Sequence, residues 1–323
     1  MSAYKNTVFS KHAFSHFDGE YHQLEPHMCM LKDRLRATAF FKQIEKYCKD
    51  KVVVDFGAGS GILGTYALMC GAKEVWFVEQ MQTLHGVIRD MVSTNHDTHY
   101  NWKVVTDVSE LPQDEDYFDV CVSECLGDLG VEKTMTYEYA QLVEKHPNCI
   151  SIPDRLDIYW STCYFPELDK EIEFIKDFPI NLHEMKDPCF SPIRAGRFTR
   201  IDDTPVEDNG LFEMYFHKWS EGYGLQNSFD ISEAIKKEPK HNYLIFYWRA
   251  FCKDEMFIHN GPDISSKNFN NWMQFGLAIE KGQNVYTGVM NHKTGPFLLY
   301  KVLDNQPRIQ YKDEEVELIG VTK

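Results

Sequence analysis

The sequence predicts an α/β protein in two parts, a parallel sheet followed by an antiparallel sheet or barrel, and three observations support this fold class. Between residues 51 and 123, short apolar runs alternate with helical patterns, which predicts a parallel sheet with right-handed crossovers. After about residue 152, short runs rich in aromatic and β-branched residues are separated by Gly, Pro, Asn and Asp, which is typical of antiparallel strands. The length of 323 residues exceeds one typical core. We therefore expect one domain over 1–152 and a second over 153–323.

The clearest single unit is the stretch from Lys51 to Gln80, which has the pattern of a strand, a turn, a helix and a second strand. The first strand ends at Asp55, and three glycines follow at positions 57, 59 and 61. Glycine permits the sharp bend that lets a ligand approach the N–H groups at the start of a helix. Glu79 ends the second strand, 24 residues after Asp55, where a carboxylate can accept hydrogen bonds from ribose hydroxyls. The unit predicts a nucleoside site; the structural alternative is a glycine-rich turn in any doubly wound sheet.

The spacing of the glycines bears on the ligand. A dinucleotide site has the pattern G-x-G-x-x-G, whereas this turn reads DFGAGSG, with an acidic residue before the glycines. The difference favours a nucleoside without phosphates.

The elements around this unit follow from hydrophobic patterning and capping residues. A helix is expected over about 32–48, with Asp33 as its N-cap. The residues expected on its buried face are Leu35, Thr38, Ala39, Ile44 and Cys48. The expected strands cover 52–55, 74–79, 102–107 and 118–123, with helices near 61–70 and 84–95. In the usual order the fourth strand lies beside the first, so the residues that follow these strands should converge on one ligand site.

Composition excludes several classes of protein. No apolar run reaches the roughly eighteen residues that a membrane span needs, and the N-terminus has no signal pattern, so we expect a cytoplasmic protein. The nine cysteines include no C-x-x-C pair, which argues against a zinc site or a disulfide framework. A net charge of −15 argues against a nucleic-acid surface and favours basic partners, or serves only solubility. The basic segment with Arg194, Arg197 and Arg200 is expected to be a solvated loop rather than an RNA-binding site.

Residues 54–79 resemble the first motif of class I S-adenosylmethionine-dependent methyltransferases, in particular the protein arginine methyltransferase branch. The resemblance covers nearly the whole chain after about Phe17. His27 with Met30–Asp33 is similar to the family's H-x-x-M-L-x-D segment. Ser123–Asp128 resembles the start of its acidic substrate loop, and Ile152–Arg155 resembles the junction into its barrel. The resemblance implies a Rossmann-like methyltransferase sheet, an antiparallel β-barrel-like domain and a dimerisation arm, here the insert at about 172–210.

The resemblance also implies roles for individual residues. The cofactor-binding positions that it implies are Arg36, Asp55, Gly57, Glu79 and Asp107. Arg36 stands where the family binds the methionine carboxylate of S-adenosylmethionine, a group that a guanidinium holds by paired donors. Glu79 would contact ribose, and Asp107 would lie near adenine. Glu124 is the first of two glutamates that hold the substrate guanidinium and aim it at the sulfonium. The implied cofactor is S-adenosylmethionine without a metal, and the implied substrates are basic arginine-glycine-rich proteins.

Three motifs depart from the family pattern. The second glutamate is expected nine residues after Glu124, but Lys133 stands there, with Glu132 beside it. A lysine would repel a guanidinium, and Glu132 could serve only if the loop were one residue shorter. Asn271 replaces the histidine of a Thr-His-Trp motif and cannot carry a charge near neutral pH. Asp18 replaces an aromatic residue of the lid over the cofactor and offers adenosine no apolar face.

These departures suggest that the scaffold was kept and the catalysis lost, as in the catalytically inactive prozyme subunits of trypanosome arginine methyltransferases, which the sequence most resembles. The leading hypothesis is a subunit that pairs with an active arginine methyltransferase paralogue, as a heterodimer or heterotetramer, and activates it. Its own cofactor binding would then be weak or lost. The alternative is an active protein arginine N-methyltransferase in which Glu132 serves. A methyltransferase for small molecules or nucleic acids is a third hypothesis, and Glu124 counts against it.

Overall fold

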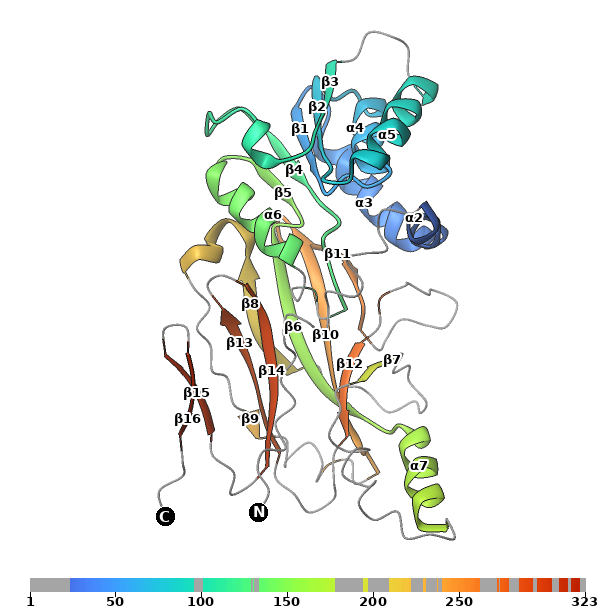
Figure 1. Ribbon diagram of the computed structural model, residues 1–323, viewed down its shortest axis with the longest axis vertical. Helices are drawn as coiled ribbons and strands as arrows, with labels where there is room; N and C mark the ends of the chain where they lie inside the picture. The colour runs from blue at the N-terminus through green and yellow to red at the C-terminus, as the bar shows by residue number, and fades with distance from the viewer. Residues whose placement is uncertain are drawn as a thin grey trace.

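The computed structural model has an α/β part at one end and a β-rich part at the other (Figure 1). It describes residues 24–95, 101–128, 130, 134–177, 194–196, 209–221, 229–230, 237, 240–261, 272, 274–278, 285–292, 295–303, 308–312 and 315–319. Within these ranges, no helix has the length and apolar character that crossing a membrane requires.

A five-stranded parallel sheet with the order β3-β2-β1-β4-β5 forms the centre of the α/β part. Its strands are β1 (Val52–Phe56), β2 (Glu74–Val78), β3 (Asn101–Val105), β4 (Val120–Val122) and β5 (Ile150–Ile152). The sequence predicted all of these except β5. As expected, β4 pairs with β1, with Cys121 opposite Val54. Every residue of β1 and β2 is buried, as is typical of central strands in a parallel sheet.

Helices surround this sheet. They are α2 (Leu24–Lys32), α3 (Arg34–Tyr47), α4 (Ile62–Met69), α5 (Gln82–Asn95) and α6 (Thr134–Lys145), with a short 3-10 helix η1 (Val108–Glu110). The predicted N-cap of α3 is confirmed, because the Asp33 carboxylate accepts the Arg36 backbone N–H at 3.1 Å. The sequence did not predict α2. Its proline lies in the first turn, where a missing N–H is tolerated, so Pro26 did not exclude a helix.

The buried face of α3 differs from the one expected from its apolar pattern. Leu35 is 44% exposed, and Thr38 is also exposed. Ile44 and Cys48 are buried as expected, and Arg36 and Phe40 join them on the buried face. These residues are four positions apart and so share one side of the helix. A helical pattern read from apolar residues alone did not place Arg36 on this face, because a charged guanidinium is not expected to point inward.

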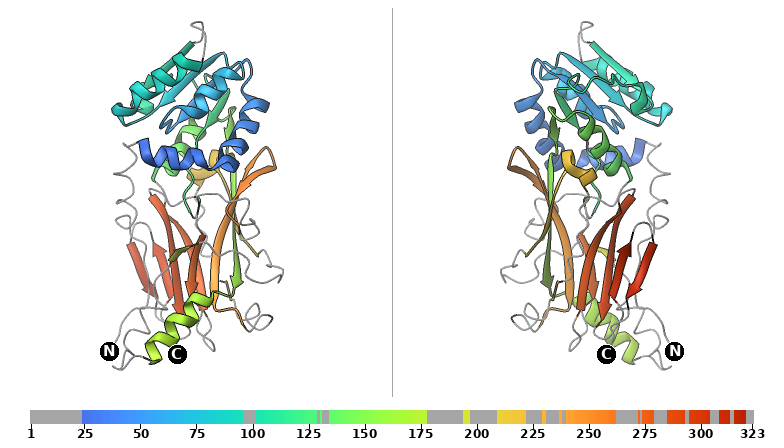
Figure 2. Two further views of the ribbon diagram at one scale, coloured as in Figure 1. Left: turned by 90° about the vertical axis from the view of Figure 1, so that its right-hand side faces the viewer. Right: turned by 90° about the vertical axis from the view of Figure 1, so that its left-hand side faces the viewer.

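The β-rich part consists of antiparallel strands, as predicted. One sheet follows the path β7-β12-β10-β6-β8, with β11 paired to β10, and a second has the order β14-β13-β9. The strands of the first sheet are β6 (Arg155–Cys163), β7 (Arg194–Gly196), β8 (Asn209–Tyr215), β10 (Tyr243–Cys252), β11 (Glu255–His259) and β12 (Gln274–Ala278). The others are β9 (Phe229–Asp230), β13 (Val285–His292), β14 (Gly295–Leu303) and the hairpin β15 (Arg308–Lys312) and β16 (Glu315–Ile319). Figure 2 shows β13 and β14 facing β6 and β10, which is a barrel-like arrangement and confirms the expected fold class.

The two parts share one hydrophobic core. Val54 and Phe77 of the parallel sheet belong to the same cluster of buried residues as Trp248 of β10. Helix α3 also contacts β11, where the Phe40 and Phe257 rings meet edge to face with centroids 5.2 Å apart. The barrel therefore supports the helix that carries Arg36.

The insert expected at about 172–210 begins within helix α7 (Pro166–Asp177). It also contains β7, which pairs with β12 at the edge of the larger sheet. The expectation of a solvated loop around Arg194 was therefore wrong, because the backbone of 194–196 continues the barrel sheet. Arg197 and Arg200 lie outside the described residues.

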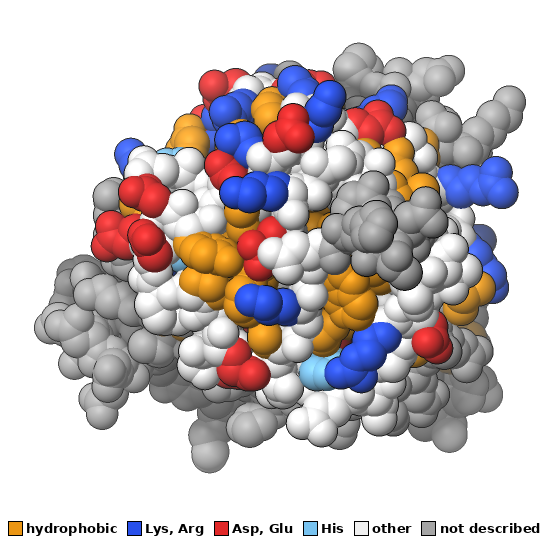
Figure 3. Space-filling view, turned by 90° about the horizontal axis from the view of Figure 1, so that it is seen from above, with side chains coloured by type: hydrophobic (Ala, Val, Ile, Leu, Met, Phe, Trp, Pro, Cys, Tyr) orange, Lys and Arg blue, Asp and Glu red, His pale blue; other side chains and the backbone are white. Residues whose placement is uncertain are grey.

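The surface at the α/β end is mixed in charge. Figure 3 shows Lys and Arg side chains interspersed with Asp and Glu side chains on this face, with hydrophobic side chains between them. The described part of this face thus presents no single basic field of the kind that tracks a nucleic-acid backbone.

Candidate functional site

The glycine-rich turn between β1 and α4 adopts a backbone that side chains disfavour. Gly57, Gly59 and Gly61 have φ values of +67°, +57° and +79°. A Cβ on Gly59 would lie 2.6 Å from Cε1 of His27. The turn therefore requires glycine for its backbone conformation and, at Gly59, for the close approach of α2.

A fourth glycine, which the sequence analysis did not single out, fixes α4 against the sheet. A Cβ on Gly64 would lie 2.3 Å from Cε1 of Phe77 on β2. The Gly64 N–H also donates to the Asp55 carboxylate at 2.8 Å. With Gly59 and Gly61 it completes the spacing G-x-G-x-x-G over residues 59–64, so the contrast with a dinucleotide pattern that the sequence analysis drew from the glycines was wrong. Close helix–strand packing is a known reason for the third glycine of that pattern.

Two buried acids hold the turn together. Asp55 accepts the Gly64 N–H, and Glu79 accepts the Gly59 N–H through one carboxylate oxygen and the Met81 N–H through the other, both at 2.7 Å. Burial raises the pKa of Asp55 to about 7; the Gly64 N–H opposes this shift and the nearby charge of Glu79 adds to it. Each oxygen of Glu79 keeps a second lone pair, so the carboxylate can still accept from a ligand hydroxyl.

One cavity of about 960 Å³ brings these groups together. All of the positions predicted for the cofactor line it: Arg36, Asp55, Gly57, Glu79 and Asp107. Glu124, predicted for the substrate, lines it as well. The cavity thus lies at the carboxyl ends of β1 and β2, next to the β1–β4 boundary where the strand order reverses, which is where ligands bind in open α/β sheets.

Asp107 has a structural role that the sequence analysis did not assign. Its carboxylate caps η1 by accepting the Ser109 N–H at 2.8 Å. Glu110 completes a capping box by accepting the Asp107 N–H at 3.1 Å. The hydrogen bond from Ser109 lowers the pKa of Asp107, and Lys145 contributes in the same direction. Asp107 is an exposed carboxylate at the rim of the cavity that remains ionised at neutral pH.

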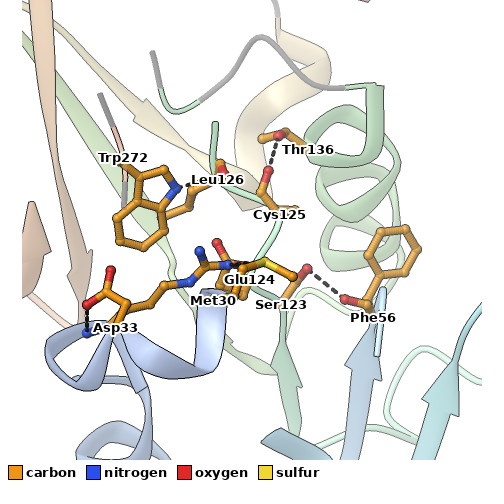
Figure 4. A network of polar contacts seen from close by, with 10 residues as sticks. Met30, Asp33, Phe56, Ser123, Glu124, Cys125, Leu126, Thr136 and Trp272 are labelled. Carbon is orange, nitrogen blue, oxygen red and sulfur yellow. Dashed lines mark hydrogen bonds and ion pairs between the residues drawn. The ribbon is translucent and has the colours of Figure 1, made fainter. Parts of the chain in front are cut away.

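Arg36 and Glu124 form an ion pair inside the cavity. The Arg36 guanidinium also donates to the Met30 sulfur at 3.1 Å and lies over the Trp272 ring, 4.6 Å from its centroid. The second oxygen of Glu124, Oε1, is buried and has no hydrogen-bond partner among the described residues. Figure 4 shows Met30, Glu124 and Trp272 gathered at this point. Arg36 is thus enclosed by an acid, a sulfur and an aromatic face.

The chain that follows Glu124 is held at four successive carbonyl groups. The oxygens of residues 125–128 accept, in order, from Thr136 Oγ1 at 2.7 Å, Trp272 Nε1 at 3.1 Å, Trp248 Nε1 at 3.0 Å and Asn260 Nδ2 at 2.7 Å. The first donor lies on α6 and the other three come from the β-rich part, and two of these contacts appear in Figure 4. We call these four donors the loop clamp. The sequence analysis missed them. Three of the four contacts join residues more than a hundred positions apart, which leaves no local pattern.

Several predicted positions lie outside the described residues. They are Asp18, Glu132, Lys133 and Asn271. The structure therefore gives no geometry for the second acidic position of the substrate loop.

The nucleoside part of S-adenosylmethionine fits this site. The N–H groups of Gly59, Gly61 and Gly64 are used within the turn, but the turn leads into the start of α4, which lines the cavity. Glu79 keeps acceptor capacity for a diol. The carboxylate end of the cofactor would meet Arg36, which already has an internal partner. Within the described ranges, no group of three or more His, Cys, Asp or Glu residues is arranged to hold a metal ion.

Comparisons with known proteins identify the family. A family model described as Conserved hypothetical protein 95 matches residues 28–124. The chain is similar to Protein arginine N-methyltransferase 1 of Caenorhabditis elegans, with 32% identity over 280 residues that cover 80% of this chain and 78% of the relative. The chain belongs to the protein arginine N-methyltransferase family.

Solved structures of arginine methyltransferases have the same fold. One is a chain of the Trypanosoma brucei PRMT1 enzyme–prozyme heterotetrameric complex with AdoHcy, which matches with a TM-score of 0.67 and 17% identity over 92% of this chain and 97% of that chain. Another is PRMT6, with a TM-score of 0.66 and 15% identity over 87% of this chain and all of that chain (100%). At these identities the likeness concerns the fold alone. The two-part architecture of this arginine methyltransferase homologue is therefore the architecture of its family.

Proposed function

We propose that this chain is a non-catalytic subunit that pairs with an active protein arginine methyltransferase and activates it. The observation that carries the proposal is Lys133, which stands where the family places the second glutamate of its substrate loop. Two carboxylates are needed to hold a guanidinium by paired hydrogen bonds and to aim one nitrogen at the methyl group. With Lys133 at the second position, Glu124 remains as the single acid, and its charge is engaged by Arg36.

A cofactor role follows from the family. Arg36, Asp55, Gly57, Glu79 and Asp107 are the residues that would hold S-adenosylmethionine. When bound, that cofactor supplies an activated methyl group on a sulfonium. We expect this chain to bind it weakly or not at all, because Asp18 replaces an aromatic lid residue and Arg36 is already ion-paired. The arginine-glycine-rich substrates would be bound by the active partner.

The assembly that we propose is a heterodimer or heterotetramer. A likeness in fold to a chain of the Trypanosoma brucei enzyme–prozyme complex supports this, because that assembly is a heterotetramer of an enzyme and a prozyme. The contact would use the arm at about 172–210, which begins on α7, where Phe174 is 61% exposed. An arm that favours the binding-competent state of its neighbour tenfold requires only about 1.4 kcal/mol of differential contact.

The second candidate function is an active arginine methyltransferase. Glu124 favours it, because this residue lies in the same cavity as the cofactor positions. Glu132 would then supply the second carboxylate from a shortened loop.

Methyl transfer by the purified chain alone separates the two candidates. We expect no transfer from S-adenosylmethionine to a glycine-arginine-rich peptide above the level of a Glu124→Gln control. Turnover in the wild type that is absent from this control would contradict the proposal, and its loss in Glu132→Gln would establish the second candidate.

Partner dependence is tested by co-purification of the untagged chain from its native cell and mass measurement of the complex. Replacing Phe174, Ile175 and Phe178 with Ala should weaken both association and the partner's activity. If the partner is fully active and stably dimeric without this chain, or if the arm variant activates it as well as the wild type, the activator function is wrong.

A further inference from the structure

We propose that Glu124 is an internal counterion of Arg36, and that it turns the cavity into a site for nucleosides that carry no free carboxylate. The inference rests on the family's cofactor class and goes beyond the activator function, because it concerns what this chain itself binds. It replaces a catalytic interpretation of Glu124 with an electrostatic one.

The first step is the enclosure of Arg36. Its side chain is 9% exposed, and the Glu124 side chain is 17% exposed. The Trp272 ring covers one face of the guanidinium at 4.6 Å, and the Met30 sulfur accepts from Nη2 at 3.1 Å. The same Nη2 atom forms the ion pair with Glu124. A ligand carboxylate must therefore share or displace the internal one to reach this guanidinium.

The second step is the charge of the cavity. Two basic side chains, Arg36 and Lys145, line it together with six acids, Asp55, Glu79, Asp107, Glu115, Glu124 and Glu138. A ligand carboxylate would add a further acid beside Glu124, and like charges at close range in a poorly hydrated site repel strongly. A neutral or cationic group meets no such repulsion. The charge of the cavity therefore disfavours ligands whose amino-acid group carries a free carboxylate.

The third step is that the part of the site for the nucleoside is independent of this ion pair. The glycine turn is held by Glu79 through the Gly59 N–H and by Asp55 through the Gly64 N–H, and neither bond involves Arg36. Base and ribose can therefore be accommodated while the internal ion pair remains in place. The chemical class that fits is an adenosine derivative with a short, uncharged or amine-bearing thioether at the 5′ position.

Isothermal titration calorimetry with three probes tests this selectivity. S-adenosylhomocysteine carries an ammonium and a carboxylate, its decarboxylated analogue carries only the ammonium, and 5′-methylthioadenosine carries neither. We expect the wild type to bind the decarboxylated analogue at least as tightly as S-adenosylhomocysteine. In Glu124→Gln, which removes the internal charge but keeps an acceptor for Arg36, the preference should shift toward S-adenosylhomocysteine by at least tenfold.

The matched control is Glu115→Gln, which removes one charge from another residue lining the same cavity. It should leave the ratio of the two affinities unchanged. Wild-type binding of S-adenosylhomocysteine tenfold tighter than its decarboxylated analogue would overturn the inference without any variant, as would an unchanged ratio in Glu124→Gln. Absence of binding by all three probes at millimolar concentration would overturn it too while leaving the activator function intact. Methyl transfer by the chain alone would contradict the activator function. The inference about ligand selectivity would still be decided by the ratio of the two affinities.

Discussion

Replacing Asp55 with Asn should stabilise the ligand-free protein at pH 8 and change its stability little near pH 4. The Asp55 side chain lies at the end of the central strand β1, and the residue is 1% exposed. Burial raises the pKa of this carboxyl from 3.8 to about 7, against the hydrogen bond from Gly64 and with a smaller contribution from Glu79. The ionised acid is therefore an unfavourable feature of the folded chain at neutral and basic pH.

The magnitude follows from proton linkage. Well below pH 3.8 the carboxyl is protonated in both the folded and the unfolded chain, so its burial removes no charge from water. Between pH 3.8 and about 7 the unfolded chain has lost a proton that the folded chain keeps, so the free energy of unfolding falls as the pH rises. A difference of about three pKa units corresponds to about 4 kcal/mol at pH 8. The Asp55→Asn variant carries no charge at this position, and the new amide oxygen can still accept the Gly64 N–H.

Urea unfolding at pH 4.5, 6 and 8 measures this difference. The matched control is Asp119→Asn. Partial burial raises the pKa of Asp119, but hydrogen bonds from Val52 and Lys51 outweigh it and leave the pKa lowered. This control should therefore lose stability at neutral pH. The reasoning about Asp55 is refuted if Asp55→Asn is no more stable than the wild type at pH 8, or if its advantage is the same at all three values.

Three further changes have expected outcomes, all measurable by urea unfolding. Gly64→Ala should lower the free energy of unfolding by about 1–3 kcal/mol through overpacking against Phe77. A second substitution, Phe77→Leu, should recover part of this loss. An unchanged stability of Gly64→Ala would contradict the close packing of the helix on the strand. Asn260→Asp should lower the free energy of unfolding by about 3 kcal/mol at pH 8 and by less at pH 5, because a carboxylate cannot donate to the Asp128 carbonyl whereas a protonated acid can. Equal losses at both pH values would argue against this role of the Asn260 amide. Converting the β10–β11 turn, where positions 253 and 254 have φ of 47° and 64°, to Asn-Gly should add roughly 1 kcal/mol; a loss would mean that the side chains of the original turn matter more than its backbone.

The parallel sheet could be predicted because its signals are local. The run from Val52 to Phe56 is apolar and followed by glycines, and each strand of this kind ends at a recognisable polar residue. The rule that ligands bind where the strand order reverses then gave the position of the cavity from strand order alone. The predicted acids at 55, 79 and 107 meet there because parallel strands present their carboxyl ends at one edge.

The loop clamp and the orientation of Arg36 could not be predicted in the same way. Trp248 and Asn260 are buried in the barrel, and each donates to a carbonyl in the chain after Glu124, more than a hundred residues earlier. Their side chains look like ordinary strand residues in the sequence. The burial of Arg36 could not be predicted either, because the helical pattern was read from apolar residues alone. The enclosure of its guanidinium also depends on Trp272, which comes from the other part of the chain.

Glu124 has a structural reason to be present that requires no catalysis. Arg36 is enclosed between Met30 and Trp272, and removing one partner of a buried ion pair typically costs about 3–5 kcal/mol, because the other charge is left without compensation. A chain that folds with Arg36 in this place therefore needs an acid beside it, whether or not a substrate guanidinium ever binds. It follows that Glu124 cannot by itself count as evidence for an active enzyme. The distinction between the two candidate functions depends on positions 132 and 133, where a lysine stands in the place of the second acid. Restoring that acid by Lys133→Glu is consequently a sharper probe of catalysis than any change at Glu124, because it leaves the counterion of Arg36 intact.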